Sequence, residues 1–108
     1  MSKVEFAEFQ KLDLRIGKVL KAERISGKSK VYKLQIDVGM EKIETISGGA
    51  EHYPPEYFVG RTVIVLVNLP TKIIGGIESR GMLLAADLQG KPIWLTVEGD
   101  IPPGTRIR

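Results

Sequence analysis

The sequence predicts a single all-β domain, and three observations support that prediction. Short runs alternate between polar and apolar residues, most clearly over residues 32–38, which is the pattern of a half-buried strand. Stretches containing glycine and proline separate these runs at short intervals and are typical of turns. The chain has 108 residues, 43% of them hydrophobic, and no cysteine, so a core can form without disulfide bonds.

The first elements are a short helix and a long strand. Phe6 and Phe9 are three positions apart, which places them on one side of a helix over residues 5–10. Residues 14–22 predict a strand, and Gly17 within it marks a bulge at which the strand can bend sharply.

The middle of the chain predicts a hairpin and a second short helix. In the strand over residues 32–38, the inward-facing positions are Leu34, Ile36 and Val38. Residues 39–42 turn the chain into a further strand over residues 43–46. Residues 54–59 begin with two prolines and suit a helix of one or two turns, which Gly60 ends.

The second half of the chain predicts further strands. Residues 61–67 are apolar on both faces, so this strand should be the most buried, and residues 81–86 form a fifth strand. Five short strands with a helix between the third and the fourth follow the element order of an OB-fold barrel. We therefore expect one domain over residues 1–108, with helix and barrel in residues 1–87 and a β extension in residues 88–108.

Charge is distributed unevenly along the chain, whose net charge is +3. Residues 11–33 carry a net charge of +6, residues 34–60 one of −4 and residues 61–91 one of +2. One side of the domain is therefore expected to be basic and to attract a polyanion. The alternative is a solvated strand face, since lysine on strand edges also prevents unwanted sheet pairing.

Residues 68–86 contain the most informative group of side chains. Five side chains that can bind a ligand occur there at adjacent strand ends. They are the amide of Asn68, the amine of Lys72, the hydroxyl of Ser79, the guanidinium of Arg80 and the thioether of Met82. Such groups bind sugar-phosphate and stack on bases. No cluster of histidine, cysteine or paired carboxylates accompanies them, so a small enzyme is the least favoured interpretation.

Seven stretches that run in order along the chain resemble one known family: residues 13–20, 30–39, 46–50, 53–56, 67–70, 76–86 and 100–104. The family is the tRNA-binding domain found at the carboxyl end of bacterial methionyl-tRNA synthetases. Free-standing members are archaeal synthetase beta subunits and small structure-specific tRNA-binding proteins, and relatives occur in cytokine-like synthetase cofactors of the EMAP-II type.

The resemblance implies a module that binds tRNA by shape and backbone charge and catalyses no reaction itself. It implies a methionyl-tRNA synthetase catalytic subunit as partner, to which this chain would be a beta subunit or a C-terminal module. It also implies a twofold homodimer formed through residues 88–108. The alternative for these residues is that they fold back over the mouth of the barrel.

Three places depart from the family pattern. Residues 25–29 lack its histidine and aspartate, so no role is transferred to them. The loop after Asn68 keeps one lysine, Lys72. Arg80 stands where the family commonly has glutamine or glutamate, and its added positive charge predicts tighter phosphate contact at this corner.

The predicted RNA-binding residues combine these two regions. They are Lys30, Lys33, Asn68, Lys72, Ser79, Arg80 and Met82, with Arg15 and Lys18 as extensions of the patch. A structural role is the alternative for several of them. The lysines can be merely solvated, Asn68 can close its turn and Met82 can fill the core.

The remaining features concern other chemistry and location. His52 lacks a further set of ligands, so no metal and no cofactor are expected, and Trp94 suits the core or an interface better than RNA. The start lacks a signal peptide and no apolar stretch reaches membrane-spanning length, which predicts a cytoplasmic protein without membrane contact. A protein-binding OB-fold that resembles an export chaperone is the alternative function.

Overall fold

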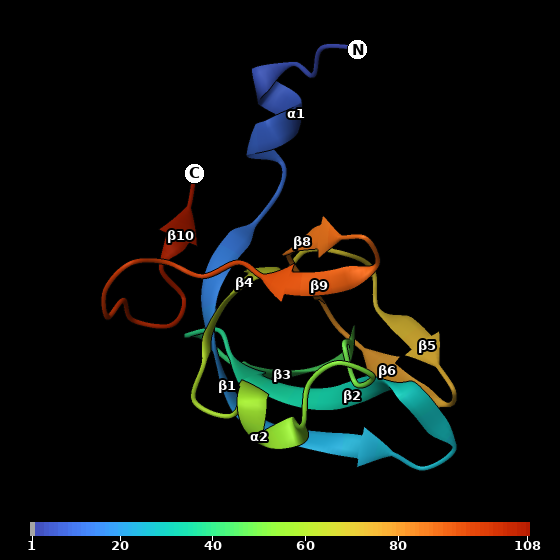
Figure 1. The fold of residues 1–108 in the computed structure, drawn as a ribbon. Coiled ribbons are helices and arrows are strands. Elements are labelled where there is room, and N and C mark those ends of the chain that lie inside the picture. Colours follow the sequence, from blue (N-terminus) through green and yellow to red (C-terminus); the bar gives the residue numbers. More distant parts are fainter. Residues whose placement is uncertain (1) are drawn as a thin grey trace.

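A six-stranded antiparallel sheet curls around the core in the computed structural model, which describes residues 2–108 (Figure 1). Five of its strands lie in the order β3-β2-β1-β4-β7, and the sixth, β10 (Arg106–Ile107), pairs with β1. The five are β1 (Leu14–Ile25), β2 (Lys28–Asp37), β3 (Lys42–Gly48), β4 (Thr62–Leu66) and β7 (Met82–Leu83). Helix α2 (Pro55–Phe58) connects β3 to β4, so the predicted OB-fold element order is confirmed.

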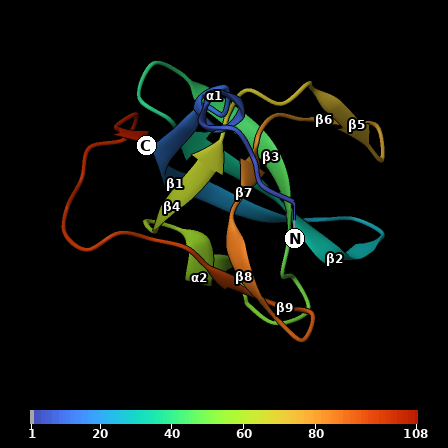
Figure 2. The ribbon, with the colours of Figure 1, turned by 90° about the horizontal axis from the view of Figure 1, so that it is seen from above.

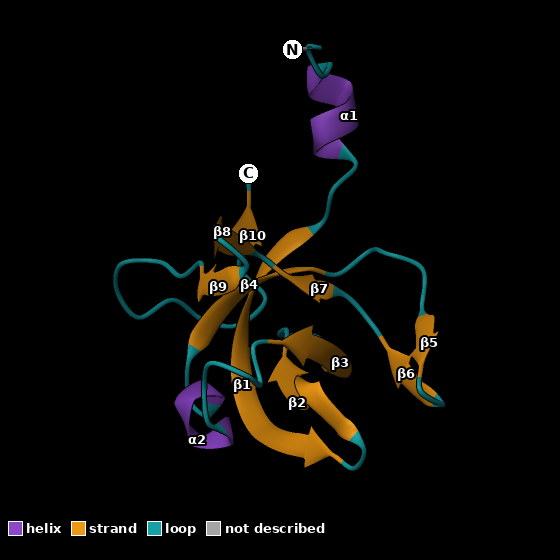
Figure 3. Ribbon diagram, turned by 45° about the vertical axis from the view of Figure 1, so that its right-hand side comes forward, coloured by secondary structure: helices purple, strands orange, loops and turns teal. Residues whose placement is uncertain are grey.

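Smaller elements lie outside this sheet (Figures 2 and 3). They are helix α1 (Phe6–Gln10), the hairpin β5 (Lys72–Ile74) with β6 (Ile77–Ser79), and the hairpin β8 (Ala85–Leu88) with β9 (Lys91–Trp94). Helix α1 stands clear of the sheet above it, and none of its residues is buried. Both predicted helices are present at the predicted positions.

The core follows the predicted alternation along β2. Leu34, Ile36 and Val38 are buried, whereas the residues between them are partly exposed. Phe58 on α2 lies at the centre of the core, with its ring 5.3 Å from that of Tyr32. The predicted inward face of this strand is confirmed.

Gly17 has a different role from the predicted bulge. A Cβ atom at this position would lie 2.7 Å from Cγ2 of Ile36 and 2.9 Å from Cγ2 of Val65, so the missing side chain lets opposite walls of the sheet approach. The pairing of β1 with β2 shifts register elsewhere, between Val19 and Lys21 and again between Arg24 and Ile25. Since β1 pairs with both β4 and β2, the first of these shifts occurs where the strand passes from one partner to the other.

The predicted strand over residues 81–86 is wrong in its extent, because two separate elements occupy it. Met82 and Leu83 pair with β4, whereas β8 pairs with β9 in a sheet of its own. The predicted boundary between residues 87 and 88 therefore falls inside β8. The loop expected after Asn68 likewise contains the β5–β6 hairpin, whose turn is formed by Gly75 and Gly76 at φ +58° and +80°.

The chain returns to β1 at its carboxyl end. Strand β10 pairs with Leu14 and Arg15 of β1, and the backbone N–H of Gly104 donates to the carbonyl of Ile16 at 2.8 Å. Gly104 lies against Gly39 so closely that a Cβ at either would fall within 2.9 Å of the other's Cα. The end of the extension thus folds back on the barrel.

Candidate nucleic-acid interface

Asn68, at the end of β4, ties this strand end to the approach of β1. Its Oδ1 accepts the backbone N–H of Asp13 at 2.9 Å, and its Nδ2 donates to the carbonyl of Lys11 at 2.7 Å. An Asn side chain that satisfies two backbone groups fixes the chain locally. Asn68, a predicted RNA contact, therefore also has a structural role in holding the two chain segments together.

β3 and the end of β6 meet along a seam without regular strand pairing, and individual hydrogen bonds connect them there. Ser79 is 6% exposed, and its Oγ accepts the N–H of Ile46 at 2.9 Å. The backbone N–H of Arg80 donates to the carbonyl of Glu44 at 2.9 Å, and the Thr45 hydroxyl donates to the carbonyl of Arg80 at 2.5 Å. These bonds fix the backbone of Arg80 while its side chain extends outward.

The Arg80 guanidinium is paired with Glu41, which lies in the turn between β2 and β3. Its two terminal nitrogens donate to the two carboxylate oxygens at 2.7 and 3.2 Å. Both side chains are about half exposed, 44% and 51%. The hydrogen bond and the charge of Arg80 lower the pKa of Glu41 below its usual value, and the same interactions with Glu41 raise the pKa of Arg80.

Lys33 is a second predicted cation that an acidic side chain covers. Its Nζ lies 3.1 Å from Oε2 of Glu44 on β3. Together with Arg80 and Glu41, this pair shows how the charged segments meet. Strand β3 and the turn before it, both in the acidic segment 34–60, lie beside β2 and bring one carboxylate to each of these two cations.

Lys30 and Lys72 are in a different situation. Both are exposed, and neither has an ion-pair partner among residues 2–108. The turn of the β5–β6 hairpin lies against the Lys28 side chain at the start of β2, so this hairpin and the β1–β2 turn are neighbours. Met82 is 46% exposed, which leaves its thioether available for contact with a ligand.

One cavity connects part of the predicted set. It has a volume of about 510 Å³, and its wall includes Arg15, Glu41, Asn68 and Arg80. Arg15 itself is engaged, since its Nε donates to Asp13 at 2.6 Å and its Nη1 to the carbonyl of Gly104 at 3.0 Å. The cavity does not include Lys30, Lys33, Lys72 or Met82, so the predicted residues fall into two neighbouring groups.

Glu41 and Glu44 were not among the predicted site residues. The signal that points to them is the net charge of −4 over residues 34–60, which along the sequence lies apart from the basic segment. Antiparallel pairing of β2 and β3 brings the two segments together. An acidic run next to a basic strand in the same hairpin is therefore a pattern that predicts covered cations.

Other residues singled out in the sequence lie outside this surface. His52 is exposed, and residues 2–108 contain no group of three or more His, Cys, Asp or Glu side chains placed to hold a metal ion. Trp94 was predicted to lie in the core or at an interface, and it packs on Phe58 of the core with ring centroids 5.4 Å apart. Within the described chain no helix has both the length and the apolar character to cross a membrane.

The chain matches a family model described as a putative tRNA binding domain over residues 14–106. It is 49% identical over 104 residues to the methionine–tRNA ligase of Archaeoglobus fulgidus, which covers 96% of this chain and 16% of that protein. The chain therefore spans about one sixth of that relative's length.

Two solved structures share the whole fold. A MetRS related protein from Pyrococcus horikoshii superposes with a TM-score of 0.94 at 37% identity, covering 100% of both chains. The chaperone CsaA from Bacillus anthracis superposes with a TM-score of 0.89 at 29% identity, covering 99% of this chain and 100% of that one.

Proposed function

This chain belongs to the tRNA-binding domain family, and we propose that it binds tRNA without catalysing a reaction of its own. The observation that carries this proposal is the family match, which covers nearly all of the barrel and its extension. The proposed contacts are the side chains of Lys30, Lys33, Lys72, Arg80 and Met82, while Asn68 and Ser79, also predicted to bind RNA, hold the backbone of this surface in place. They lie on β2, on β7 and in the segment that connects β4 to β7.

Backbone charge supplies the affinity in this proposal. Lys30 and Lys72 are exposed and free of ion pairs in the described chain, so each can neutralise a phosphate and release a counterion. Met82 offers a half-exposed thioether on which a base or ribose can lie. Folded tRNA would then be selected by shape, with a few unstacked bases in contact with the sheet.

The proposed partner is the catalytic subunit of a methionyl-tRNA synthetase. The relatives that support this are methionine–tRNA ligases, in which the matched region is 16% of the protein. A bound tRNA-binding module raises the local concentration of tRNA at the synthetase without any new contact in the active site. The chain would act as a beta subunit or as a C-terminal module, and a cytoplasmic location belongs to the same proposal.

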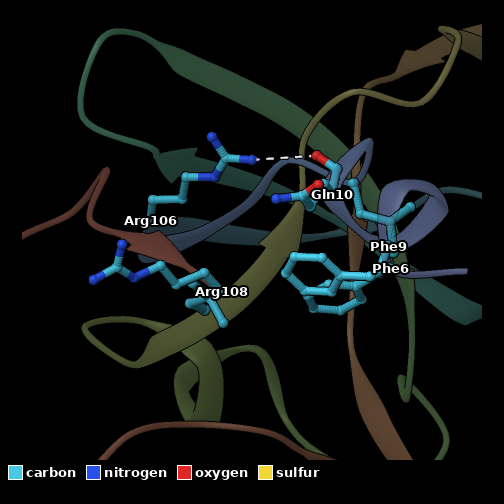
Figure 4. A pocket seen from close by; sticks show the side chains of 7 residues that line it. Phe6, Phe9, Gln10, Arg106 and Arg108 are labelled. Atoms are coloured by element: carbon cyan, nitrogen blue, oxygen red, sulfur yellow. Dashed lines mark hydrogen bonds between the residues drawn. The ribbon is translucent and has the colours of Figure 1, made fainter.

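A homodimer is the second part of the proposal, and helix α1 supports it. Phe6 is 69% exposed and Phe9 39%, and their rings stack with centroids 6.4 Å apart. Figure 4 shows both rings beside the carboxyl end of the chain, where Arg106 donates to the carbonyl of Gln10 at 3.4 Å. Together they line a cavity of about 350 Å³.

An isolated helix of five residues is marginal in water, because few hydrogen bonds offset the ordering of its backbone. Its apolar side therefore needs a covering partner, and a second copy related by a twofold axis supplies the same surface in return. The extension adds exposed apolar side chains, Leu88, Ile93 and Leu95. We propose that α1 contributes to the dimer interface alongside the predicted residues 88–108.

Sedimentation equilibrium tests the dimer. We expect a dimer at micromolar concentration for the wild type and dissociation for Phe6→Ser, with Val59→Ser as a matched control, since Val59 is also exposed but lies after α2. If the wild type sediments as a monomer at this concentration, the proposed dimer is refuted, and the proposal that the chain binds tRNA is unchanged.

Filter binding of tRNA, duplex RNA and an unfolded peptide over a range of salt concentrations tests the RNA-binding proposal. We expect tRNA to bind most tightly and to lose affinity steeply as salt rises. The chaperone structure gives a protein-binding alternative a specific observation in its favour, and that alternative predicts peptide binding that salt hardly changes. Co-purification with a methionyl-tRNA synthetase that lacks its own tRNA-binding domain tests the proposed partner.

A further inference from the structure

Because Arg80 is paired with Glu41, an RNA phosphate can bind the Arg80 guanidinium only after it displaces the Glu41 carboxylate. We propose that Glu41 occupies, in the free protein, the position that an RNA phosphate takes on the Arg80 guanidinium, and so restrains binding until the phosphate displaces it. This inference rests on the proposed function, and it assigns to Glu41 the role of an internal competitor.

Geometry is the first support for this inference. The carboxylate accepts hydrogen bonds from both terminal nitrogens of Arg80, at 2.7 and 3.2 Å. A phosphate binds a guanidinium through the same two parallel N–H groups. The carboxylate and a phosphate therefore compete for one set of donors.

The fixed backbone of Arg80 is the second support. Its N–H donates to the carbonyl of Glu44 and its carbonyl accepts from the Thr45 hydroxyl, so the guanidinium can move only by rotation of its own side chain. Glu41 lies in the turn after Val38, which the hydrogen bond between the Val38 N–H and the Glu41 carbonyl closes at 3.0 Å. The carboxylate can thus swing away without breaking any hydrogen bond of the sheet.

Accessibility is the third support. Arg80 and Glu41 are 44% and 51% exposed, so a phosphate can approach the pair from solvent. Ion pairs at this degree of exposure are weak, which allows a strongly charged RNA to break this one. Met40, beside Glu41, is 94% exposed, so the turn leaves the approach open.

A double-mutant cycle on the 108-residue chain tests the inference. The variants are Glu41→Gln, Arg80→Gln and the combination of both, and tRNA affinity is measured by filter binding at low salt. Glu8→Gln is the matched control, because Glu8 is also exposed and paired, with Lys11 at 3.3 Å, but lies on the projecting helix α1. Thermal melting checks that each variant folds.

We expect Glu41→Gln to bind tRNA about threefold more tightly than the wild type, and Glu8→Gln to bind as the wild type does. In the Arg80→Gln background, Glu41→Gln should have no more effect than the control, because the masked cation is absent. This combination of results supports the inference.

Three results would overturn it. Equal affinity of Glu41→Gln and Glu8→Gln would show that Glu41 does not restrain binding. A gain that persists in the Arg80→Gln background would show simple repulsion between Glu41 and the RNA. A loss of affinity in Glu41→Gln would make Glu41 a residue that positions Arg80 for its contact. If the wild type itself failed to bind tRNA, the proposed function would fall as well, which distinguishes that failure from the other three.

Discussion

The connection between β4 and β7 contains two kinds of polar residue with different roles. Asn68 and Ser79 are of the first kind, and Lys72 and Arg80 are of the second. The first two have side chains hydrogen-bonded to backbone groups in other parts of the chain, at Asp13, Lys11 and Ile46. The second two extend into solvent, one alone and one in an exposed ion pair. A polar side chain at a strand end therefore stabilises the fold where a neighbouring backbone N–H or carbonyl lacks a hydrogen-bond partner. Where no such group is near, the side chain stays available to a ligand.

The largest effect that this comparison predicts is on stability. Ser79→Ala removes the acceptor of the Ile46 N–H inside the seam, and a buried donor left without a partner costs about 1–3 kcal/mol of unfolding free energy. Lys72→Ala is the control and should change stability by less than about 0.5 kcal/mol. Urea unfolding of both variants measures the difference.

The same variants separate the two roles of Ser79. The affinity of Ser79→Ala for tRNA, measured where the variant is fully folded, should equal that of the wild type. A clear loss of affinity there would show that the hydroxyl contacts RNA as well as the Ile46 backbone.

The next effect concerns the two free lysines. Lys30→Gln and Lys72→Gln should each remove one phosphate contact, which lowers the salt slope by about 1 and the affinity about five- to eightfold at 0.1 M salt. Lys3→Gln is the matched control, because it removes the same charge from the chain that precedes α1. If all three substitutions had the same effect, net charge would explain the binding and the proposed surface would not.

Arg80→Gln should lower affinity less than either lysine substitution, by about two- to threefold. The reason is that a phosphate must first displace Glu41, so part of the contact is offset in the wild type. The sequence alone predicts a strong contact here, and the structure reduces that expectation. An unchanged affinity and salt slope would refute a role for Arg80 in binding.

The difference between these expectations shows what a sequence can predict. The alternation over residues 32–38 and the turn at residues 39–42 are local patterns, and the strands and hairpin they predicted are present. The partners of polar side chains are not local. Arg80 and Glu41 are 39 positions apart, and they meet because the segment between β6 and β7 is hydrogen-bonded to β3, next to the β2–β3 turn.

The β5–β6 hairpin escaped prediction for a related reason. Its strands are three residues each, too short for the alternation of polar and apolar residues to appear, and the two glycines at its turn also suit an open loop. Residues 81–86 show the converse error. Their apolar run is continuous, but pairing divides it between the main sheet and the hairpin with β9.

The smallest predicted effect is the pH dependence of the Arg80–Glu41 pair. The pKa of Glu41 is lowered in the folded protein, chiefly by the hydrogen bond from Arg80 and then by its charge. A lowered pKa means that the pair stabilises the folded state above the unfolded pKa of the carboxyl group, and that this contribution disappears as the pH falls through the folded pKa. Wild type and Glu41→Gln should therefore differ slightly in melting temperature at neutral pH and converge in acid, with Glu8→Gln as the control for an ordinary exposed carboxylate. Since the pair is exposed, the difference in melting temperature should be small. A large difference that persisted in acid would mean that Glu41 supports the β2–β3 turn through contacts other than its charge. The contrast between side chains that close the fold and side chains that extend into solvent would then not hold at Arg80 and Glu41.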